Sequence, residues 1–243
     1  MRLNVLKACL ALCLVVVMGA ALQEKFPVHR PLNIFREAPR VYAPMVVKRL
    51  HPAVDAELRG MGLHRRYLLE WRDRHPTAAL RHLWGMEERD QKTCARIARY
   101  ILRQNRSIVP ELAWVEAAAL VHYSAKYGAP VERAVAVANT ESHFNPTSLS
   151  SYGAMGVMQV VWRIHEGLLR ANGILSGEEL YNPDRGIAAG CLLLGRYLRA
   201  EGDTRDALGR YAGGAVDAYC GKVEGNMARF RRLVAEAGNS RGL

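Results

Sequence analysis

The chain has 243 residues, half of them hydrophobic, and a formal net charge of +11. This composition indicates a globular protein, and the length allows one good domain with a smaller appendage. The charge is uneven, because residues 23–110 carry 18 Lys and Arg against 9 Asp and Glu, whereas residues 111–243 carry 14 of each. The basic part could attract an anionic polymer or a membrane surface, or it could be a solvated arginine-rich face.

Residues 1–21 have the pattern of an export signal. Arg2 and Lys7 are followed by an uncharged stretch that runs from Ala8 to Leu22, with small residues at positions 19–21. This stretch is short for a membrane span, which needs roughly 20 apolar residues, although an uncleaved anchor is the alternative. We therefore expect an exported protein of the periplasm or cell envelope, which argues against nucleic acid as a partner.

Three cysteines follow the predicted signal, and they could form one disulfide bond. Exported proteins tolerate disulfides, so Cys191 could pair with Cys220. Alternatively, Cys191 packs as a small hydrophobic residue, because the run around it is apolar. No cysteine or histidine spacing suggests a metal site, and we expect no cofactor.

Residues 22–110 are expected to form a basic linker followed by helices. Prolines are frequent up to Pro52, and they favour an extended chain. Helical patterns then return at residues 63–74, 77–84 and 87–105.

Residues 111–243 are expected to form a separate, mainly α domain. Proline opens a helix at Pro110 and glycine ends it at Gly128. Further helices are expected at residues 130–141, 160–171, 182–199, 204–211 and 219–237. The alternation of apolar and polar residues that is typical of a strand is confined to a short segment within residues 151–160.

Glu141 stands out at the end of the second of these helices. Four apolar residues with helical spacing form one stripe, and Glu141 continues it. The stripe consists of Val131, Ala134, Val135 and Ala138. A carboxyl group on the side that faces the core has a raised pKa, which suits a general acid near neutral pH. The alternative is a buried glutamate paired with an arginine.

The loop at residues 142–159 has the composition of a cleft wall. It contains serine hydroxyl groups, flexible glycines at Gly153 and Gly156, and the side-chain amide of Gln159. One acid beside hydroxyl and amide groups suits an uncharged, hydroxyl-rich substrate such as a glycan. The alternative is a surface loop capped by its own serines.

The order of motifs in this half of the chain resembles that of the soluble lytic transglycosylases of bacterial cell walls. The first motifs are Glu141-Ser142-x-Phe144-Asn145-Pro146, Ser150 and Gly153-Ala154-Met155-Gly156-x-Met158-Gln159. The later ones are Tyr181-Asn182-Pro183 with Ile187, Gly190 and Tyr197-Leu198, then Tyr211-x-x-Gly214 and Tyr219-x-x-Lys222-Val223. The similarity covers roughly residues 111–235.

The resemblance implies a lysozyme-like α domain with a substrate groove. It implies cleavage of the β-1,4 bond between N-acetylmuramic acid and N-acetylglucosamine in peptidoglycan, without water, to give a 1,6-anhydromuramic product. Glu141 would act first as acid and then as base. The residues implied to contact substrate are Ser150, Met158, Gln159, Tyr211 and Tyr219. Glycan strands would be the partner, together with a cell-envelope machine bound through the basic region at residues 23–110.

Three positions depart from the family's motifs. Ala212 stands where the family has asparagine, Trp162 where proline is common, and Gly186 where asparagine is usual. These departures weaken the assignment of the residues that contact substrate more than the assignment of Glu141 as the catalytic residue. A lysozyme-type hydrolase and a non-catalytic wall-binding protein are the alternative functions.

Overall fold

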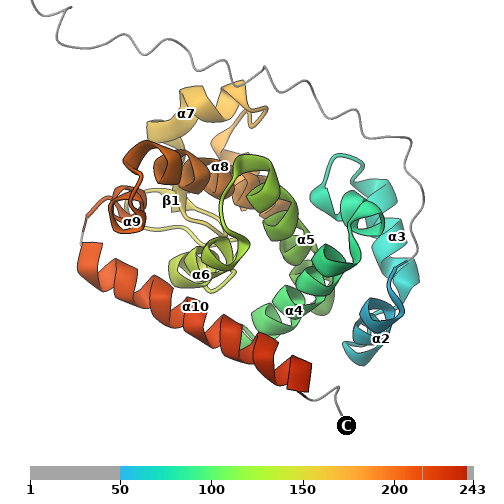
Figure 1. Cartoon of the computed structure of the whole chain (residues 1–243). Helices are drawn as coiled ribbons and strands as arrows, with labels where there is room; N and C mark the ends of the chain where they lie inside the picture. The colour runs from blue at the N-terminus through green and yellow to red at the C-terminus, as the bar shows by residue number, and fades with distance from the viewer. Residues whose placement is uncertain (1–49, 215, 240–243) are drawn as a thin grey trace, which may run out of the picture. The chain divides into compact units, whose positions relative to one another are not determined.

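The computed structural model describes residues 50–214 and 216–239 (Figure 1). The described residues lie within one compact unit of the chain. The predicted export signal and most of the predicted proline-rich linker lie outside the described residues. Within the described part of the chain, no helix is both long enough and apolar enough to span a membrane.

The described residues are mostly helical, so the prediction of a mainly α fold is confirmed. The first helices are α2 (Pro52–Gly60), α3 (Arg65–Arg74), the 3-10 helix η2 (Ala79–Gly85), α4 (Glu88–Gln104), α5 (Pro110–Tyr127) and α6 (Val131–Ser142). Next come the two-residue strands β1 (Ala154–Met155) and β2 (Val160–Val161). The chain ends with α7 (Trp162–Ala171), the 3-10 helix η3 (Gly177–Tyr181), α8 (Pro183–Glu201), α9 (Thr204–Ala212) and α10 (Val216–Asn239).

Local sequence explains several helix ends. Gly128 ends α5 in the left-handed conformation, with a φ of 70°. The side chain of Asn182 accepts hydrogen bonds from the backbone N–H groups of Asp184 and Arg185, which caps α8. Helix α2 was not predicted, since its first residue, Pro52, was assigned to the linker. Its start is capped instead by the side chain of His51.

Helix α5 is the centre of the hydrophobic core. Its residues from Ala113 to Val121 are all buried, and all of them except Glu116 are apolar, so almost the whole circumference of this stretch packs into the core. It packs against α4 and η2 on the N-terminal side of the sequence and against α6 and α8 on the C-terminal side. Residues 50–109 therefore share one hydrophobic core with the rest of the described residues.

Asp184 reinforces this junction with hydrogen bonds. Its buried carboxyl group accepts from the backbone N–H of Ala79 in η2 at 2.7 Å and from the hydroxyl of Tyr123 in α5 at 2.9 Å. Since Asp184 lies in the first turn of α8, one side chain joins three elements that are far apart in the sequence. The cost of burying the carboxyl group is offset by these bonds.

The strands β1 and β2 pair antiparallel, with Ala154 opposite Val161 and Met155 opposite Val160. They form in the segment where the sequence showed a short alternation. The turn between them includes Gly156, whose φ is 74°. A Cβ atom at Gly156 would lie 2.0 Å from the carbonyl oxygen of Leu180, so the loop can approach η3 only through a glycine.

The three cysteines among the described residues form no disulfide. Cys94, Cys191 and Cys220 are all free and buried. Cys191 therefore packs as a small apolar side chain, which was one of the two alternatives. It does not pair with Cys220.

Gly190 in α8 offers a test of how closely the side chain of Met158 packs on this helix. A Cβ atom there would lie 2.4 Å from both Cβ and Sδ of Met158, so Gly190→Ala should lower the free energy of unfolding by about 1–3 kcal/mol. The matched control is Gly221→Ala, also inside a helix but with nothing within 4 Å, which should raise it by about 0.5–1 kcal/mol. Urea denaturation measures both. Equal effects of the two substitutions would contradict the close packing of Met158 on α8.

Candidate active site

Glu141 lies in the last turn of α6, where the chain turns sharply. The two residues after the helix, His143 and Phe144, both have a positive φ, of 53° and 63°. Such a conformation is unusual for residues other than glycine and needs support from its surroundings. Phe144 supplies that support, because its side chain is fully buried and packs edge-on against Tyr100, with ring centroids 6.0 Å apart. The turn thus fixes the end of the helix that carries Glu141.

The carboxyl group of Glu141 has a tyrosine as its hydrogen-bond partner. The hydroxyl of Tyr219 in α10 donates to Oε1 of Glu141 at 2.5 Å. Burial raises the pKa of Glu141 to about 7, and the bond from Tyr219 opposes this rise only in part. Among the described residues no arginine forms an ion pair with Glu141, and the predicted rise in the pKa of Glu141 has the predicted cause, burial.

Tyr219 keeps its proton in this setting. Burial and the neighbouring charge of Glu141 both raise the pKa of Tyr219, so its hydroxyl group is a hydrogen-bond donor near neutral pH. Tyr211 in α9 lies close by, since the charge of Glu141 also contributes to raising the pKa of Tyr211 after burial. The structure thus brings Glu141, Tyr211 and Tyr219 together.

A buried polar network behind Glu141 holds three helices in place. The side-chain amide of Asn139 in α6 donates to the hydroxyl of Tyr100 in α4 and to Oδ1 of Asn226 in α10, both at 3.0 Å. Asn226 in turn donates to Oγ1 of Thr140 at 2.8 Å. Such networks fix one arrangement of the elements they join. Glu141 and Tyr219 are on two of these helices, so the network sets their separation.

This network was not predicted from the sequence. Tyr100, Asn139 and Asn226 come from helices that are far apart in the chain, and no spacing connects them. The available signal was weak: Asn139 and Asn226 are polar residues that fall on otherwise apolar helix faces.

The loop after α6 is tied to the helix by Ser142. Its hydroxyl donates to the carbonyl oxygen of Val157 at 2.7 Å and accepts from the backbone N–H of Asn145 at 3.0 Å. Within the loop, the hydroxyl of Ser150 accepts from the backbone N–H of Ala154 at 3.0 Å. The predicted contact of Ser150 with substrate stays a prediction, and in this structure its hydroxyl helps to shape the β1 turn.

Met158 and Gln159 are held by the loop in different ways. Met158 is fully buried against Gly190, and its carbonyl oxygen accepts a hydrogen bond from Tyr211 at 2.8 Å. The side-chain amide of Gln159 donates to the carbonyl oxygens of Ser148 at 3.1 Å and Gly156 at 3.0 Å. Met158 thus supports the site from behind. Its predicted contact with substrate and that of Gln159 stay predictions.

Within residues 50–214 and 216–239, no group of three His, Cys, Asp or Glu side chains is placed to hold a metal ion. The expectation that no cofactor takes part therefore still rests on the sequence.

Residues 119–222 match the model of a protein family described as the transglycosylase SLT domain. This segment is therefore similar to the transglycosylase SLT domain family, and the match covers less than half of the chain. It contains Glu141 and both tyrosines beside it, and it lies within the range over which the motifs predicted a resemblance. The predicted resemblance is thereby confirmed, over a somewhat shorter segment.

Known relatives match only part of this chain. A transglycosylase from Enterobacteria phage PRD1 is 34% identical over 112 residues, which are 43% of this chain and 40% of the phage protein. The chain thus matches less than half the length of that relative. The 70 kDa soluble lytic transglycosylase SLT70 from Escherichia coli has a crystal structure that matches 76% of this chain and 33% of its own, with 21% identity and a TM-score of 0.39.

The raised pKa of Glu141 predicts how the stability of the protein depends on pH. The pKa of Glu141 rises from 4.5 to about 7 on folding, so the folded state binds its proton more tightly. The ionised carboxyl group therefore costs stability, and this cost grows as the pH rises from 4.5 to about 7. Glu141→Gln removes it, and should stabilise the protein at pH 8 by about 2 kcal/mol, with a much smaller gain at pH 5.

Thermal unfolding of both proteins across this pH range measures the difference. The control Glu166→Gln changes an exposed carboxyl group on α7 and should give no such trend. A gain from Glu141→Gln that is the same at pH 5 and pH 8 would contradict the raised pKa.

Proposed function

We propose that the protein is a peptidoglycan lytic transglycosylase that uses Glu141 as its only catalytic carboxyl group. The observation that carries the proposal is the setting of this side chain: it is largely removed from water, it receives one hydrogen bond from Tyr219, and its pKa is raised to about 7. A group with this pKa is partly protonated at neutral pH. It can therefore give up a proton in one step and take one in the next.

The reaction needs no other acid. Protonated Glu141 donates its proton to the glycosidic oxygen, and the bond from C1 of the muramic residue to that oxygen breaks with its electron pair going to the oxygen. The substrate's own N-acetyl group stabilises the cation at C1. The carboxylate of Glu141 then takes the proton from the O6 hydroxyl, and O6 forms a bond to C1. The product is a 1,6-anhydro ring, Glu141 is protonated again, and no water is consumed.

Tyr219 has a positioning role in this scheme. Its hydroxyl group donates to the carboxylate that forms after the first proton transfer, which stabilises the charged form of Glu141 between the two steps. Tyr211 anchors the loop from the other side by donating to the carbonyl oxygen of Met158. Together they hold the carboxyl group at the end of α6 in one orientation.

A lysozyme-type hydrolase is the second candidate, and it is less well supported. Hydrolytic glycosidases usually place two carboxyl groups about 5–9 Å apart across the scissile bond. Among the described residues, no second carboxyl group affects the pKa of Glu141. Two acids of the same domain, Glu166 and Asp217, instead form ion pairs with Arg170 and Arg205.

The cellular role follows from the substrate and the predicted export signal. An exported enzyme of this kind would remodel the cell wall or open local gaps in it, in the periplasm or at the cell envelope. A cell-envelope machine that recruits it through residues 23–110 is part of the proposal. If residues 1–21 are not cleaved, they would anchor the enzyme to the membrane, and this is the alternative form of the proposal.

Digestion of purified cell wall tests the proposal. The wild-type protein should release muropeptides that end in 1,6-anhydromuramic acid, identified by mass spectrometry. Glu141→Gln should lower the rate by at least about 1,000-fold, because it removes the only group that transfers protons. The control Glu166→Gln should keep the wild-type rate. Reducing muramic ends without anhydro products would favour the hydrolase, and unchanged wall with intact binding would favour a non-catalytic binding protein.

Tyr219→Phe tests the second part of the mechanism. The bond from Tyr219 lowers the pKa of Glu141, so its removal should raise that pKa further. The pH at which activity declines on the alkaline side should move upward, while the maximal rate falls about tenfold. The control Tyr67→Phe, at an exposed position in α3, should leave the profile unchanged. An alkaline limb that stays in place or moves downward would contradict this role of Tyr219.

A further inference from the structure

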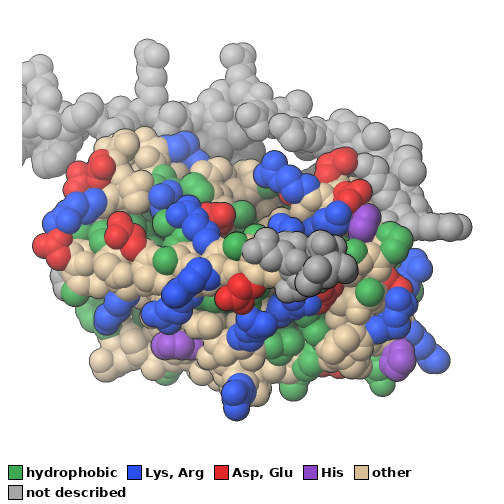
Figure 2. Space-filling view, turned by 60° about the horizontal axis from the view of Figure 1, so that its bottom comes forward, with side chains coloured by type: hydrophobic (Ala, Val, Ile, Leu, Met, Phe, Trp, Pro, Cys, Tyr) green, Lys and Arg blue, Asp and Glu red, His purple; other side chains and the backbone are tan. Residues whose placement is uncertain are grey.

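One face of the described unit gathers arginine and lysine side chains over α10 (Figure 2). Helix α4 contributes a row with helical spacing, in which Arg103 lies one turn beyond Arg99, and α10 contributes Arg229 and Arg232. The two helices pack against each other, and Tyr100 links them through a hydrogen bond of 3.1 Å to the carbonyl oxygen of Asn226. The row and the end of α10 therefore form one continuous basic surface.

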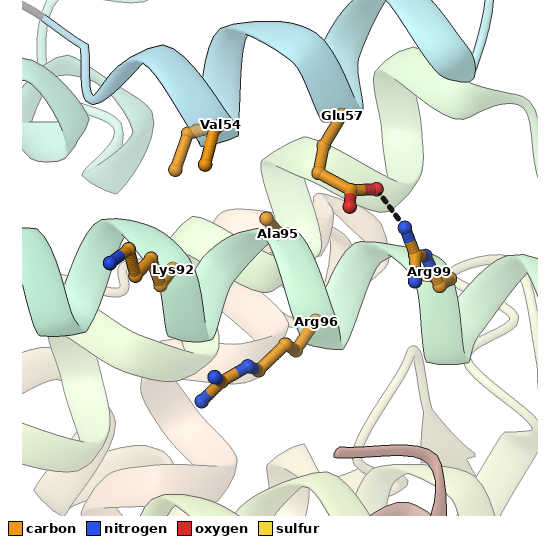
Figure 3. Close-up of a pocket in the computed structure, with 7 residues that line it drawn as sticks. Val54, Glu57, Lys92, Ala95, Arg96 and Arg99 are labelled. Atoms are coloured by element: carbon orange, nitrogen blue, oxygen red, sulfur yellow. Dashed lines mark hydrogen bonds and ion pairs between the residues drawn. The ribbon is translucent and has the colours of Figure 1, made fainter. Parts of the chain in front are cut away.

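At one end of the row, the basic side chains are already covered. Figure 3 shows α2 lying over α4, with Glu57 paired to Arg99 above Lys92 and Arg96. The remaining space is about 20 Å³, enough for about one water molecule. This end has its own acidic partner and no room for a larger ligand.

The other end of the row is open. A hollow of about 230 Å³ lies between α4 and α10, lined by Arg103, Arg229 and Arg232 over a floor that includes Tyr100 and Leu233. Arg103 forms a loose ion pair with Glu236 at 3.6 Å. Arg229 and Arg232 have no ion-pair partner among the described residues. The side chains that line the hollow thus carry three positive charges and one negative charge, that of Glu236, which leaves an excess of two positive charges.

This hollow is connected to the active site through the buried network. Its floor residue Tyr100 receives a hydrogen bond from Asn139, two residues before Glu141. Gln104, which also lines the hollow, accepts from the same amide at 3.3 Å. On α10, Arg229 is ten residues beyond Tyr219, which corresponds to about 15 Å along the helix.

We propose that this hollow binds a carboxylate of the peptide that peptidoglycan carries on its muramic acid, while the glycan lies at Glu141. An extended peptide spans about 3.3 Å per residue, so a stem of about five residues covers about 17 Å and reaches from Glu141 to Arg229. Arginine binds carboxylates through paired N–H groups. The inference rests on the proposed function and adds to it a site for the peptide part of the substrate.

The test uses Arg229→Gln/Arg232→Gln in the full chain, with cleavage measured on wall glycan strands that carry their peptides and on the same strands after an amidase has removed them. On peptide-bearing strands the KM should rise about tenfold with little change in kcat, because binding is lost equally in the ground and transition states. On stripped strands both parameters should stay at the wild-type values.

The control is Arg96→Gln/Arg231→Gln, which also removes two positive charges, one from α4 and one from α10, but changes no residue that lines the hollow. It should keep wild-type parameters on both substrates. A similar loss in both double variants, a loss on stripped strands, or no loss at all would overturn the proposal. The second of these outcomes would indicate a structural effect, and the last a surface for a different partner, such as an acidic protein.

A binding measurement separates this inference from the proposed function. Glu141→Gln protein should co-sediment with peptide-bearing strands more strongly than with stripped strands, and adding Arg229→Gln/Arg232→Gln should remove the difference. If the wild type cleaves neither substrate, the proposed function fails, and co-sedimentation still decides whether the hollow binds peptide. Equal sedimentation with both substrates would overturn the inference alone.

Discussion

The site depends on keeping the carboxyl group of Glu141 away from water while one hydroxyl group, that of Tyr219, still reaches it. Burial alone would favour the neutral acid, and several strong donors would favour the carboxylate. One donor in a largely dry setting leaves the two forms close in free energy near pH 7. A group balanced in this way can serve in turn as acid and as base.

The helical scaffold maintains this balance. Helix α6 carries Glu141 and α10 carries Tyr219, and the hydrogen bonds among Asn139, Asn226 and Tyr100 prevent the two helices from sliding past each other. Helix α4 takes part in the network, although it belongs to the basic half of the sequence. The residues before the matched segment therefore complete the core on which the site stands.

The sequence predicted the parts of the site that depend on local patterns. Glu141 was predicted because helical spacing placed it on an apolar stripe, and Tyr211 and Tyr219 because they match motifs of a known family. The role of Tyr100 could not be predicted, since its contact with Asn139 joins helices 39 residues apart and periodicity does not encode such pairs. Helix α2 was missed for a different reason: proline at its first turn is as typical of a helix start as of a linker.

Met158 shows what a motif leaves undetermined. Its position in the Gly-x-Met-Gln motif implies contact with substrate, which stays a prediction, and its side chain packs against Gly190 in α8, 32 residues further along the chain. Whether a motif residue faces the ligand or supports the residues that do so is decided by such long-range packing, which the motif itself does not contain.

Direct titration of Glu141 tests the central claim. The protein can be labelled with ¹³C at the glutamate side-chain carboxyl groups, and the resonance that disappears in Glu141→Gln assigns this residue. We predict that its chemical shift titrates with a midpoint near pH 7, well above the value of 4.5 for an unperturbed glutamate. A midpoint near pH 4.5 would mean that the carboxyl group is ionised throughout the neutral range, and would contradict the account of Glu141 as an acid that is also a base.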